Sequence, residues 1–318
     1  MLKKSDGEFV SGEDMATKLN ITRAGVWKHI KKLRENGLDI IGKKNGYKIN
    51  DSPDLLQPEK IQKNLNTKII GKNIFYRPKV DSTNNIAKKM ARENAVDGTV
   101  IIAEEQTAGK GRLERNFYSP KEKCILFSIV LRPKCLPKDA PKFTLLAAVA
   151  VARAMEKFNL HAEIKWPNDI VHNGRKIVGI LTELAAEVDF VKWIVVGVGI
   201  NVNIKPEEFP EDIKNIASSL YEINGNKNLS RVDFFQTLLE EFDKLYLSAN
   251  ENGFGEILNL WRKYNDTLGK NIKVISADTG DVFFGKAIDI DSDGALIVET
   301  ENGRQTVYAG DVSIRKAD

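Results

Sequence analysis

Residues 108–117, with the sequence AGKGRLERNF, combine glycines and cations in a pattern that could hold an anion. The glycines, cations and closing aromatic of this glycine-basic loop are Gly109, Gly111, Lys110, Arg112, Arg115 and Phe117. Glycines let backbone N–H groups come close to a ligand, and lysine and arginine supply positive charge. The same composition is common in solvated surface loops, so the pattern alone leaves both interpretations open. It is not a dinucleotide-binding fingerprint, because Glu114 stands where the third glycine belongs.

Further polar residues fall at expected strand ends and turns, where ligand sites tend to form. The motif DSTNN (81–85) follows one strand and opens a helix, so it offers hydroxyls, amides and free backbone N–H groups. Gln106 ends the strand before the glycine-basic loop, and KWPND (165–169) forms a sharp turn. Lys176 begins a strand, and Asn201 ends a buried one. Taken singly, each also has an ordinary structural role.

The elements that must position these residues alternate over residues 70–265. Strands are predicted at NIFYRPKV, GTVIIAEEQ, CILFSIVLR, AEIKWPNDI, RKIVGILTEL and VKWIVVGVGINVNI, and helices at NNIAKKMARENA and PKFTLLAAVAVARAMEKFN. We expect a mixed α/β domain with one sheet covered by helices.

Residues 9–50 carry the pattern of a winged helix-turn-helix. Helices are predicted over 11–20 and 23–36 with a tight turn between them, and DIIGKKNGYKI predicts a hairpin around Asn45-Gly46. Only MLKKSDG precedes the two helices, so either the usual first helix is shortened or the natural chain begins upstream. A small helical adaptor with a solvated basic face is the alternative.

In a winged helix-turn-helix the second helix would enter the major groove and the wing would touch phosphate. The candidate DNA-binding residues are Thr22, Arg23, Lys28, Lys31, Lys43 and Lys44. Trp27 is expected to pack in the core or at the groove edge rather than to contact a base.

The C-terminal residues, 267–318, alternate with period two between DTGD, DSDG and ENG turns. This pattern predicts a small five-stranded, SH3-like β-barrel.

Composition supports a cytoplasmic protein of several domains. The chain has 318 residues, of which 42% are hydrophobic and 29% charged, without a membrane-length apolar run or a secretory signal. Its two cysteines, Cys124 and Cys135, match no metal or disulfide spacing. Residues 1–50 carry a net charge of +5 within a chain of +4, so a basic head precedes a nearly neutral body.

Five motifs, DSTNN, EEQTAGKGR, KWPNDI, RKIVGILTE and GVGINVN, stand in an order and spacing that resembles the biotin protein ligase family. The basic head makes the chain more similar to the bifunctional members, which also act as the biotin operon repressor. The resemblance covers nearly the whole chain. It implies an α+β protein with a winged helix-turn-helix (1–62), a mixed α/β ligase domain of the class II synthetase-like biotin ligase fold (66–265) and an SH3-like domain (267–318).

The resemblance also implies roles for individual residues. The residues that match biotin contacts are Ser82, Thr83, Asn84, Gln106, Lys110, Gly111, Arg112 and Lys176, and those that match ATP or adenylate contacts are Arg115, Phe117, Lys165, Asp169, Asn201 and Arg315. Lys176 and Arg112 are the catalytic candidates. Mg²⁺ is expected with ATP near Asn201, without a fixed set of protein ligands. Three departures concern the loop: Lys110 replaces the usual arginine, Phe117 a common tryptophan, and Leu113-Glu114 a more basic pair.

The implied reaction converts biotin and ATP to biotinyl-5'-AMP and then biotinylates one lysine of a biotin carboxyl carrier domain. The adenylate would also act as co-repressor, by promoting a homodimer that binds operator DNA upstream of biotin genes. Three alternatives stay open: a lipoate–protein ligase, a ligand-sensing repressor without catalysis, and a ligase whose DNA-binding head is non-functional. The loop and KWPND argue against the first, and Lys176, Arg112 and Asn201 against the second.

Overall fold

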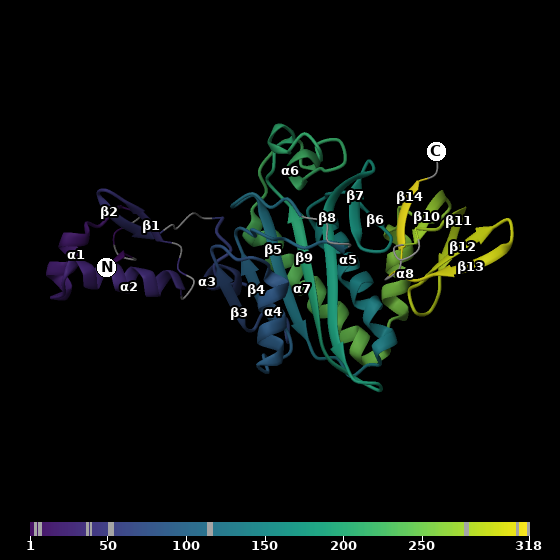
Figure 1. Cartoon of the computed structure of the whole chain (residues 1–318), viewed down its shortest axis with the longest axis horizontal. Coiled ribbons are helices and arrows are strands. Elements are labelled where there is room, and N and C mark those ends of the chain that lie inside the picture. Colours follow the sequence, from purple (N-terminus) through teal and green to yellow (C-terminus); the bar gives the residue numbers. More distant parts are fainter. Residues whose placement is uncertain are drawn as a thin grey trace.

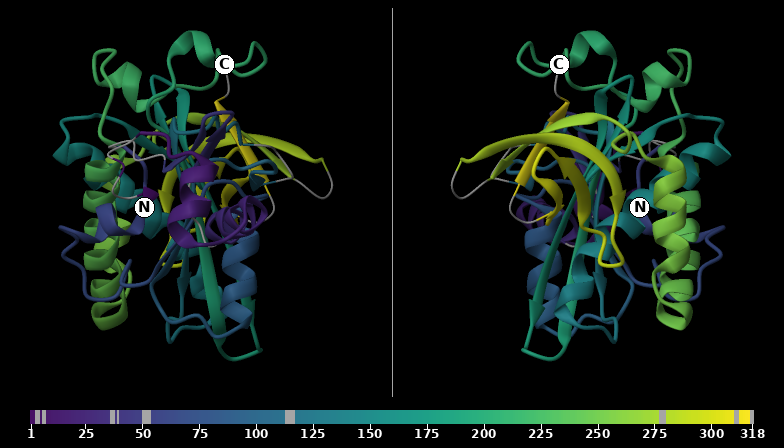
Figure 2. Two further views of the ribbon diagram at one scale, coloured as in Figure 1. Left: turned by 90° about the vertical axis from the view of Figure 1, so that its left-hand side faces the viewer. Right: turned by 90° about the vertical axis from the view of Figure 1, so that its right-hand side faces the viewer.

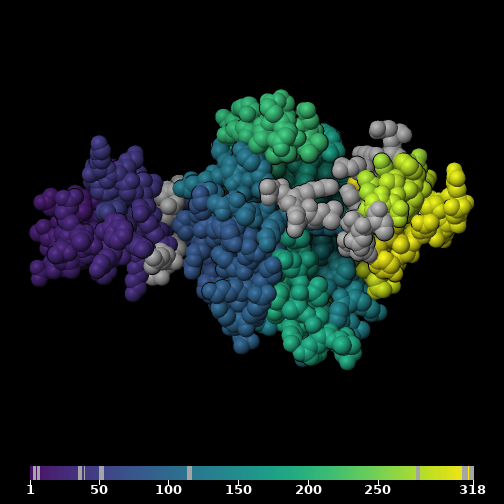
Figure 3. Space-filling view, in the orientation of Figure 1, coloured from purple at the N-terminus to yellow at the C-terminus, as the bar shows by residue number. Residues whose placement is uncertain are grey.

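The computed structural model of the chain describes residues 1–2, 5, 8–35, 38, 40–49, 54–112, 117–276, 280–309 and 312–316. For residues 35, 312, 313, 315 and 316 it describes the backbone alone. Three parts follow one another along the long axis: a small N-terminal head, a central α/β body and a C-terminal sheet (Figure 1). In the space-filling view the head forms a lobe at one end of the molecule (Figure 3).

The body is built on a seven-stranded sheet in the order β3-β4-β5-β9-β8-β7-β6. Its strands are β3 (Ile74–Arg77), β4 (Thr99–Ala103), β5 (Cys124–Leu131), β6 (Glu163–Lys165), β7 (Asp169–His172), β8 (Arg175–Ala186) and β9 (Val191–Asn201). β3 and β4 run parallel, and every other neighbouring pair is antiparallel. The two longest strands, β8 and β9, form a hairpin near the middle of the sheet, and they carry two of the five motifs.

Helices cover both faces of this sheet. Val100 and Ile102 of β4 belong to the large core that includes α5 (Ala140–Lys157) and α7 (Arg231–Asn252). Ile101, between them, belongs instead to a smaller core with α4 (Thr83–Arg92). Figure 2 shows α4 and α7 on opposite sides of the sheet. This alternation is expected of a strand whose two faces are both buried.

The remaining helices of the body are α3 (Pro58–Gln62), α6 (Leu220–Ile223) and α8 (Gly255–Tyr264). α3 lies against α7, and Gln236 of α7 donates a hydrogen bond of 2.8 Å to the carbonyl oxygen of Ile61 in α3. Leu56 and Ile61 are fully buried in the large core, so the chain after the head packs on the body from residue 54.

The C-terminal part is a five-stranded antiparallel sheet in the order β13-β12-β11-β10-β14. Its strands are β10 (Asn271–Ser276), β11 (Val282–Ile290), β12 (Leu296–Thr300), β13 (Gly303–Val307) and β14 (Val312–Lys316). Trp166 of the KWPND motif donates from Nε1 to the carbonyl oxygen of Gly294 at 3.1 Å. Arg262 of α8 contacts Asp289 at 2.7 Å. These contacts hold the C-terminal sheet beside the KWPND turn.

The head consists of α1 (Gly12–Leu19), α2 (Arg23–Glu35), β1 (Ile40–Lys43) and β2 (Gly46–Ile49). Side-chain oxygens of Ser11 and Thr22 cap the two helices, each accepting a backbone N–H at 3.0 Å. A separate core of Met15, Ala16, Val26, Ile30 and Ile40 holds the helices against the hairpin.

The fold class expected from the sequence is therefore confirmed, with two local corrections. The hairpin pairs Lys43 with Gly46, so its turn is Lys44-Asn45 rather than Asn45-Gly46. Gly46 instead lets the hairpin backbone lie close to Val10, since a Cβ at this position would be 2.1 Å from the carbonyl oxygen of Val10. Trp27 is not a core residue: its side chain is 55% exposed. Across the described residues, none of the helices has the length and apolar character needed to span a membrane.

Candidate functional site

A pocket opens between the start of α4, the glycine-basic loop and the hairpin of β8 and β9. Eight of the predicted site residues line it: Ser82, Thr83, Asn84, Gln106, Lys110, Gly111, Phe117 and Lys176. The other lining residues are Asn168, Gly179, Ile180, Leu181, Gly197, Val198 and Gly199. Segments separated by more than 100 residues in the sequence therefore form one site.

A buried polar network forms the floor of the pocket. Thr83 donates from its backbone N and its hydroxyl to Gln106 Oε1, at 2.7 and 3.0 Å. Ser128 Oγ lies 2.8 Å from Thr83 Oγ1 and 2.6 Å from Asn84 Oδ1. Asn84 donates from Nδ2 to Glu183 Oε2 at 2.8 Å. Because each amide is oriented by these partners, the network presents donors and acceptors in fixed positions.

Glycines on β9 make room for this network and for Phe117. A Cβ at Gly197 would lie 1.9 Å from Asn84 Oδ1, and one at Gly199 would lie 2.8 Å from Phe117 Cε1. Real Cβ atoms do not approach other atoms so closely, so larger residues would displace both side chains. The motif GVGIN thus supplies close backbone approach at two positions on one face of the sheet.

Lys176, near the start of β8, contributes a positive charge to the pocket. Its Nζ lies 2.6 Å from Asp169 Oδ1, and its side chain is 38% exposed. The backbone of Lys176 is also fixed, because its N–H donates to Ile216 and its carbonyl accepts from Ser218, each at 2.8 Å. Two neighbouring segments therefore determine where this ammonium group lies.

The glycine-basic loop reaches both the pocket and the C-terminal sheet. Lys110 Nζ lies 3.4 Å from Asn85 Oδ1. Arg112 is 3.4 Å from Asn168 Oδ1, and it also donates to the carbonyl oxygen of Ala309 in the C-terminal part. Arg112 thus approaches the pocket through Asn168 without lining it. Residues 113–116, which include the predicted site residue Arg115 and the departures at Leu113 and Glu114, lie outside the described residues.

Four other predicted residues do not line the pocket. Lys165 is half-buried in β6, and Asp169 reaches the site through its ion pair with Lys176. Asn201 is 5% exposed and donates to the carbonyl oxygen of Ser218 at 2.9 Å. The backbone of Arg315 lies in β14, paired with Lys273, and its side chain is outside the described atoms.

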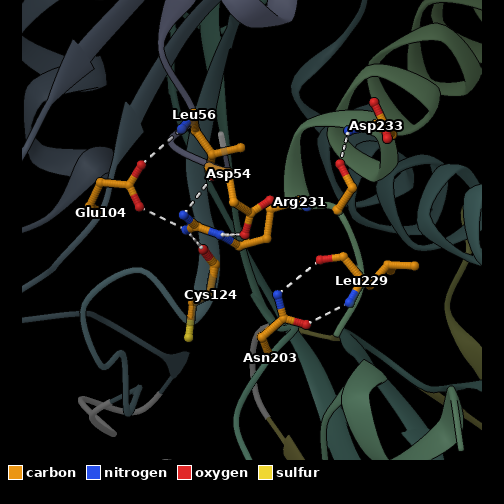
Figure 4. Close-up of polar contacts among 9 residues, drawn as sticks. Asp54, Leu56, Glu104, Cys124, Asn203, Leu229, Arg231 and Asp233 are labelled. Carbon is orange, nitrogen blue, oxygen red and sulfur yellow. Dashed lines mark hydrogen bonds and ion pairs between the residues drawn. The ribbon is translucent and has the colours of Figure 1, made fainter. Parts of the chain in front are cut away.

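A buried ion pair lies where the segment that follows the head packs on the body (Figure 4). Arg231 of α7 is 1% exposed, and its Nη1 lies 2.7 Å from Glu104 Oε2 and 2.8 Å from the carbonyl oxygen of Cys124. Asp54 in the linker accepts hydrogen bonds from Arg231 N and Nε at 2.6 and 2.9 Å. Glu104 also accepts from the backbone N–H of Leu56 at 2.9 Å. Burial raises the pKa of Glu104, although the Arg231 guanidinium opposes this shift.

Sequence reasoning missed the network residues Ser128 and Glu183 and the pocket residues Asn168 and Gly179. Ser128 had a signal, since it is the polar residue within the apolar strand CILFSIVL. Asn168 stood inside a recognised motif without being singled out. Gly179 and Glu183 also stood inside a recognised motif, RKIVGILTE, but their roles depend on which strands pair.

The six candidate DNA-binding residues, Thr22, Arg23, Lys28, Lys31, Lys43 and Lys44, are all exposed on the head. Thr22 caps α2, the next three lie on α2, and the last two lie at the tip of the β1–β2 wing. Arg23, Lys28, Lys31, Lys43 and Lys44 are therefore exposed cations on the second helix and the wing.

Comparison with known proteins agrees with this geometry. The model of the biotin/lipoate A/B protein ligase family matches residues 76–201, and that of the biotin protein ligase C-terminal domain matches residues 267–315. A helix-turn-helix domain model matches residues 1–48. The first match covers the central sheet of the body, and the other two fall on the C-terminal sheet and the head.

Individual relatives extend the likeness over the whole chain. The bifunctional ligase/repressor BirA of Bacillus spizizenii is 37% identical over 99% of this chain and 96% of its own length. BirA of Escherichia coli is 30% identical over 99% of this chain and 95% of its own length. The structure of the Aquifex aeolicus biotin protein ligase with biotin and ATP superposes with a TM-score of 0.67, at 29% identity, over 77% of this chain and all of that one. From its head, its pocket and these relatives, this chain belongs to the biotin protein ligase family and, within it, to the bifunctional ligase/repressors.

Proposed function

We propose that the pocket binds biotin beside the network of Thr83, Asn84 and Gln106 and joins its carboxylate to the α-phosphate of ATP. The products are biotinyl-5'-AMP and pyrophosphate, and biotin then passes to one lysine of a biotin carboxyl carrier domain. One observation carries this proposal: the same pocket contains an oriented amide–hydroxyl network at one side and the ammonium group of Lys176 at the other.

The network suits a ureido ring. Such a ring offers two N–H donors and one carbonyl acceptor on a neutral, planar group. Ser82, Thr83, Asn84 and Gln106 supply hydroxyl and amide groups of both kinds, and the first three are at most 4% exposed. A buried polar group that pairs with its ligand discriminates strongly against a ligand without that partner. We infer that this network separates biotin from lipoate, which has no ureido group.

Lys176 and the loop suit the acidic end of the substrate. A carboxylate and a triphosphate repel each other at bonding distance, so the reaction needs positive charge between them. Lys176 is held by Asp169, and Lys110 and Arg112 approach from the loop. In this assignment Lys176 donates a hydrogen bond to the biotin carboxylate, while a carboxylate oxygen attacks the α-phosphorus of ATP and pyrophosphate leaves. Arg112 neutralises the negative charge that develops on the phosphate oxygens.

Phe117 offers an aromatic face for the nucleotide, since its ring lies across Gly199 and approaches Gly179. We propose Arg115, Lys165 and Arg315 as further adenylate contacts, with Asp169 acting through Lys176. The side chain of Asn201 faces Ser218 and Cys124 rather than the pocket. The described residues contain no cluster of three or more His, Cys, Asp or Glu that could hold a metal. We propose that Mg²⁺ comes with ATP and is not held by a fixed set of protein ligands.

The regulatory half of the proposal concerns the head. We propose that the adenylate-bound protein forms a homodimer that places two α2 helices on operator DNA upstream of biotin genes. The exposed cations on α2 and on the wing supply the charge such binding needs.

Two assays test this proposal. Biotin-dependent pyrophosphate release, with lipoate as the competing substrate, tests the pocket. Transfer of labelled biotin to an apo carrier domain tests the second step. Absence of biotin-dependent pyrophosphate release would rule out the ligase assignment, and faster turnover of lipoate would identify a lipoate ligase instead.

A further inference from the structure

The outward face of α2 carries an aromatic residue between two cations. Arg23, Trp27 and Lys31 are spaced four residues apart, so they share one face of the helix, and all three are exposed. Val26 and Ile30, each one residue before Trp27 and Lys31, are 3% exposed in the head core. The exposed stripe of α2 therefore borders the buried stripe that holds the head together.

Trp27 differs from the other tryptophans of the chain. Its side chain is 55% exposed, whereas Trp166, Trp193 and Trp261 are 1%, 6% and 0% exposed. Its ring has the Lys31 ammonium 5.7 Å from its centroid, which is within the range of a cation–π contact. A large exposed aromatic among cations is typical of a binding surface, because it gains most when a partner covers it.

The charge around Trp27 selects the kind of partner. Arg23 and Lys31 flank it on α2, Lys28 and Lys32 add exposed positive charge further round the helix, and the first turn of this helix contains no acidic residue. A polyanion complements this surface. Trp27 is also the fifth residue of α2, and the N-terminal residues of a recognition helix are the ones that reach base edges.

Within the major groove, the apolar feature is the 5-methyl group of thymine. An indole ring cannot form the bidentate hydrogen bonds that identify guanine or adenine, but it can cover a methyl group. We propose that Trp27 determines sequence specificity by packing against the 5-methyl group of a thymine in each half-site. This inference rests on the proposed DNA binding by the head and names the base that the head selects.

The test uses the full chain with biotin and MgATP. Sequences that bind are recovered from a random duplex library, and each thymine of the recovered site is then replaced by deoxyuridine, which lacks the methyl group. At the contacted thymine the wild type should lose about fourfold in affinity, since one buried methyl group contributes about 0.8 kcal/mol. Trp27→Ala should bind on the order of tenfold more weakly and should no longer distinguish thymine from uracil there.

Lys28→Ala is the matched control from the same helix. It should weaken binding to every duplex and reduce the salt dependence by about one unit, while keeping the preference for thymine. Fluorescence gives an independent readout, because Trp27 is the exposed tryptophan. DNA should reduce the quenching of tryptophan fluorescence by acrylamide in the wild type. In Trp27→Phe, DNA should not change the quenching.

Each contrary outcome is distinguishable. Recovery of no bound sequence, with carrier biotinylation intact, would overturn both the DNA-binding proposal and this inference. Recovery of a site that Trp27→Ala and the wild type bind alike, or that tolerates uracil throughout, would overturn this inference alone. Protection of Trp27 at high protein concentration without DNA would assign its face to a second copy of the chain.

Discussion

Lys176 Nζ lies 2.6 Å from Asp169 Oδ1, across two adjacent strands of the central sheet. The ion pair orients the ammonium group. Backbone hydrogen bonds between Lys176 and the segment before α6 hold the backbone of Lys176 in place. In the proposed assignment, the biotin carboxylate would share this ammonium group with Asp169. Such a prepositioned cation stabilises charge that develops in a reaction more than charge that is already present.

We accordingly expect Lys176→Ala to reduce adenylate formation about 100-fold, equivalent to about 3 kcal/mol, while biotin affinity changes much less. Pyrophosphate release measures the first quantity and calorimetric titration with biotin the second. Lys192→Ala is the control, because Lys192 forms an exposed ion pair with Glu187 away from the pocket. Equal losses of rate and affinity would make Lys176 a binding residue only.

Gly197→Ala should weaken biotin binding by about tenfold or more, because its Cβ would lie 1.9 Å from Asn84 Oδ1 and displace that amide. Gly255→Ala is the control, since a Cβ at Gly255 meets no atom within 4 Å. In a double-mutant cycle, Gly197→Ala should add little to Asn84→Ala, because the clash is then absent. Additive losses would show that Gly197 acts independently of Asn84.

Gly111→Ser and Arg112→Gly should let biotinyl-5'-AMP escape. Arg112 joins Asn168 at the pocket to Ala309 in the C-terminal sheet, so its loss opens one side of the site. We expect adenylate release to accelerate about tenfold or more, since charged hydrogen bonds contribute about 1.5–3 kcal/mol each. Biotinylation of bystander lysines measures the escape, and Lys138→Ala, on an exposed turn, is the control. Unchanged release would refute closure by this loop.

Stability should fall in acid partly because of Glu241, whose carboxylate is buried among Arg153, Lys157 and Lys244. Burial alone would raise the pKa of Glu241, but hydrogen bonds from the two lysines and the charge of Arg153 outweigh it and lower that pKa. A lowered pKa means that this stabilisation is present above the ordinary glutamate range and is lost as pH falls through the folded-state value.

Glu241→Gln should therefore lower the thermal midpoint at neutral pH and make its decline in acid shallower. Thermal unfolding at a series of pH values measures both effects. Glu187→Gln, in an exposed pair, should leave the acid slope unchanged. Parallel curves for Glu241→Gln and the wild type would show that other carboxylates dominate.

The elements of the body could be predicted because strand and helix periodicities are strong in this sequence. Thr83, Gln106 and Lys176 stand out in the sequence as polar residues at expected strand ends and turns, the family resemblance gives them roles, and the structure brings them to one pocket. The reason for Gly197 could not be predicted, since it depends on which strand pairs with β9 and which helix crosses it. Sequence alone shows a glycine without showing what approaches it.

Arg231 and Trp27 show how residue type alone can mislead about burial. Arginine is usually exposed and tryptophan usually covered, yet Arg231 is 1% exposed and Trp27 is 55% exposed. The burial of Arg231 depends on carboxylates from two distant segments, Asp54 and Glu104. Such partners meet only in the folded chain, so no local pattern reveals them.

The buried Arg231 ion pair bears on how this protein can be divided or recombined. Removing residues 1–62 as one module would delete Asp54 and Leu56, so Arg231 would lose the carboxylate and carbonyl of Asp54 and Glu104 would lose the N–H of Leu56, although the Glu104–Arg231 pair itself would remain. Each buried polar group left without its partner costs about 1–3 kcal/mol. We therefore propose that the head ends before Asp54. A chimera that exchanges DNA-binding heads should keep residues 54–62 with the recipient ligase, as part of its own interior.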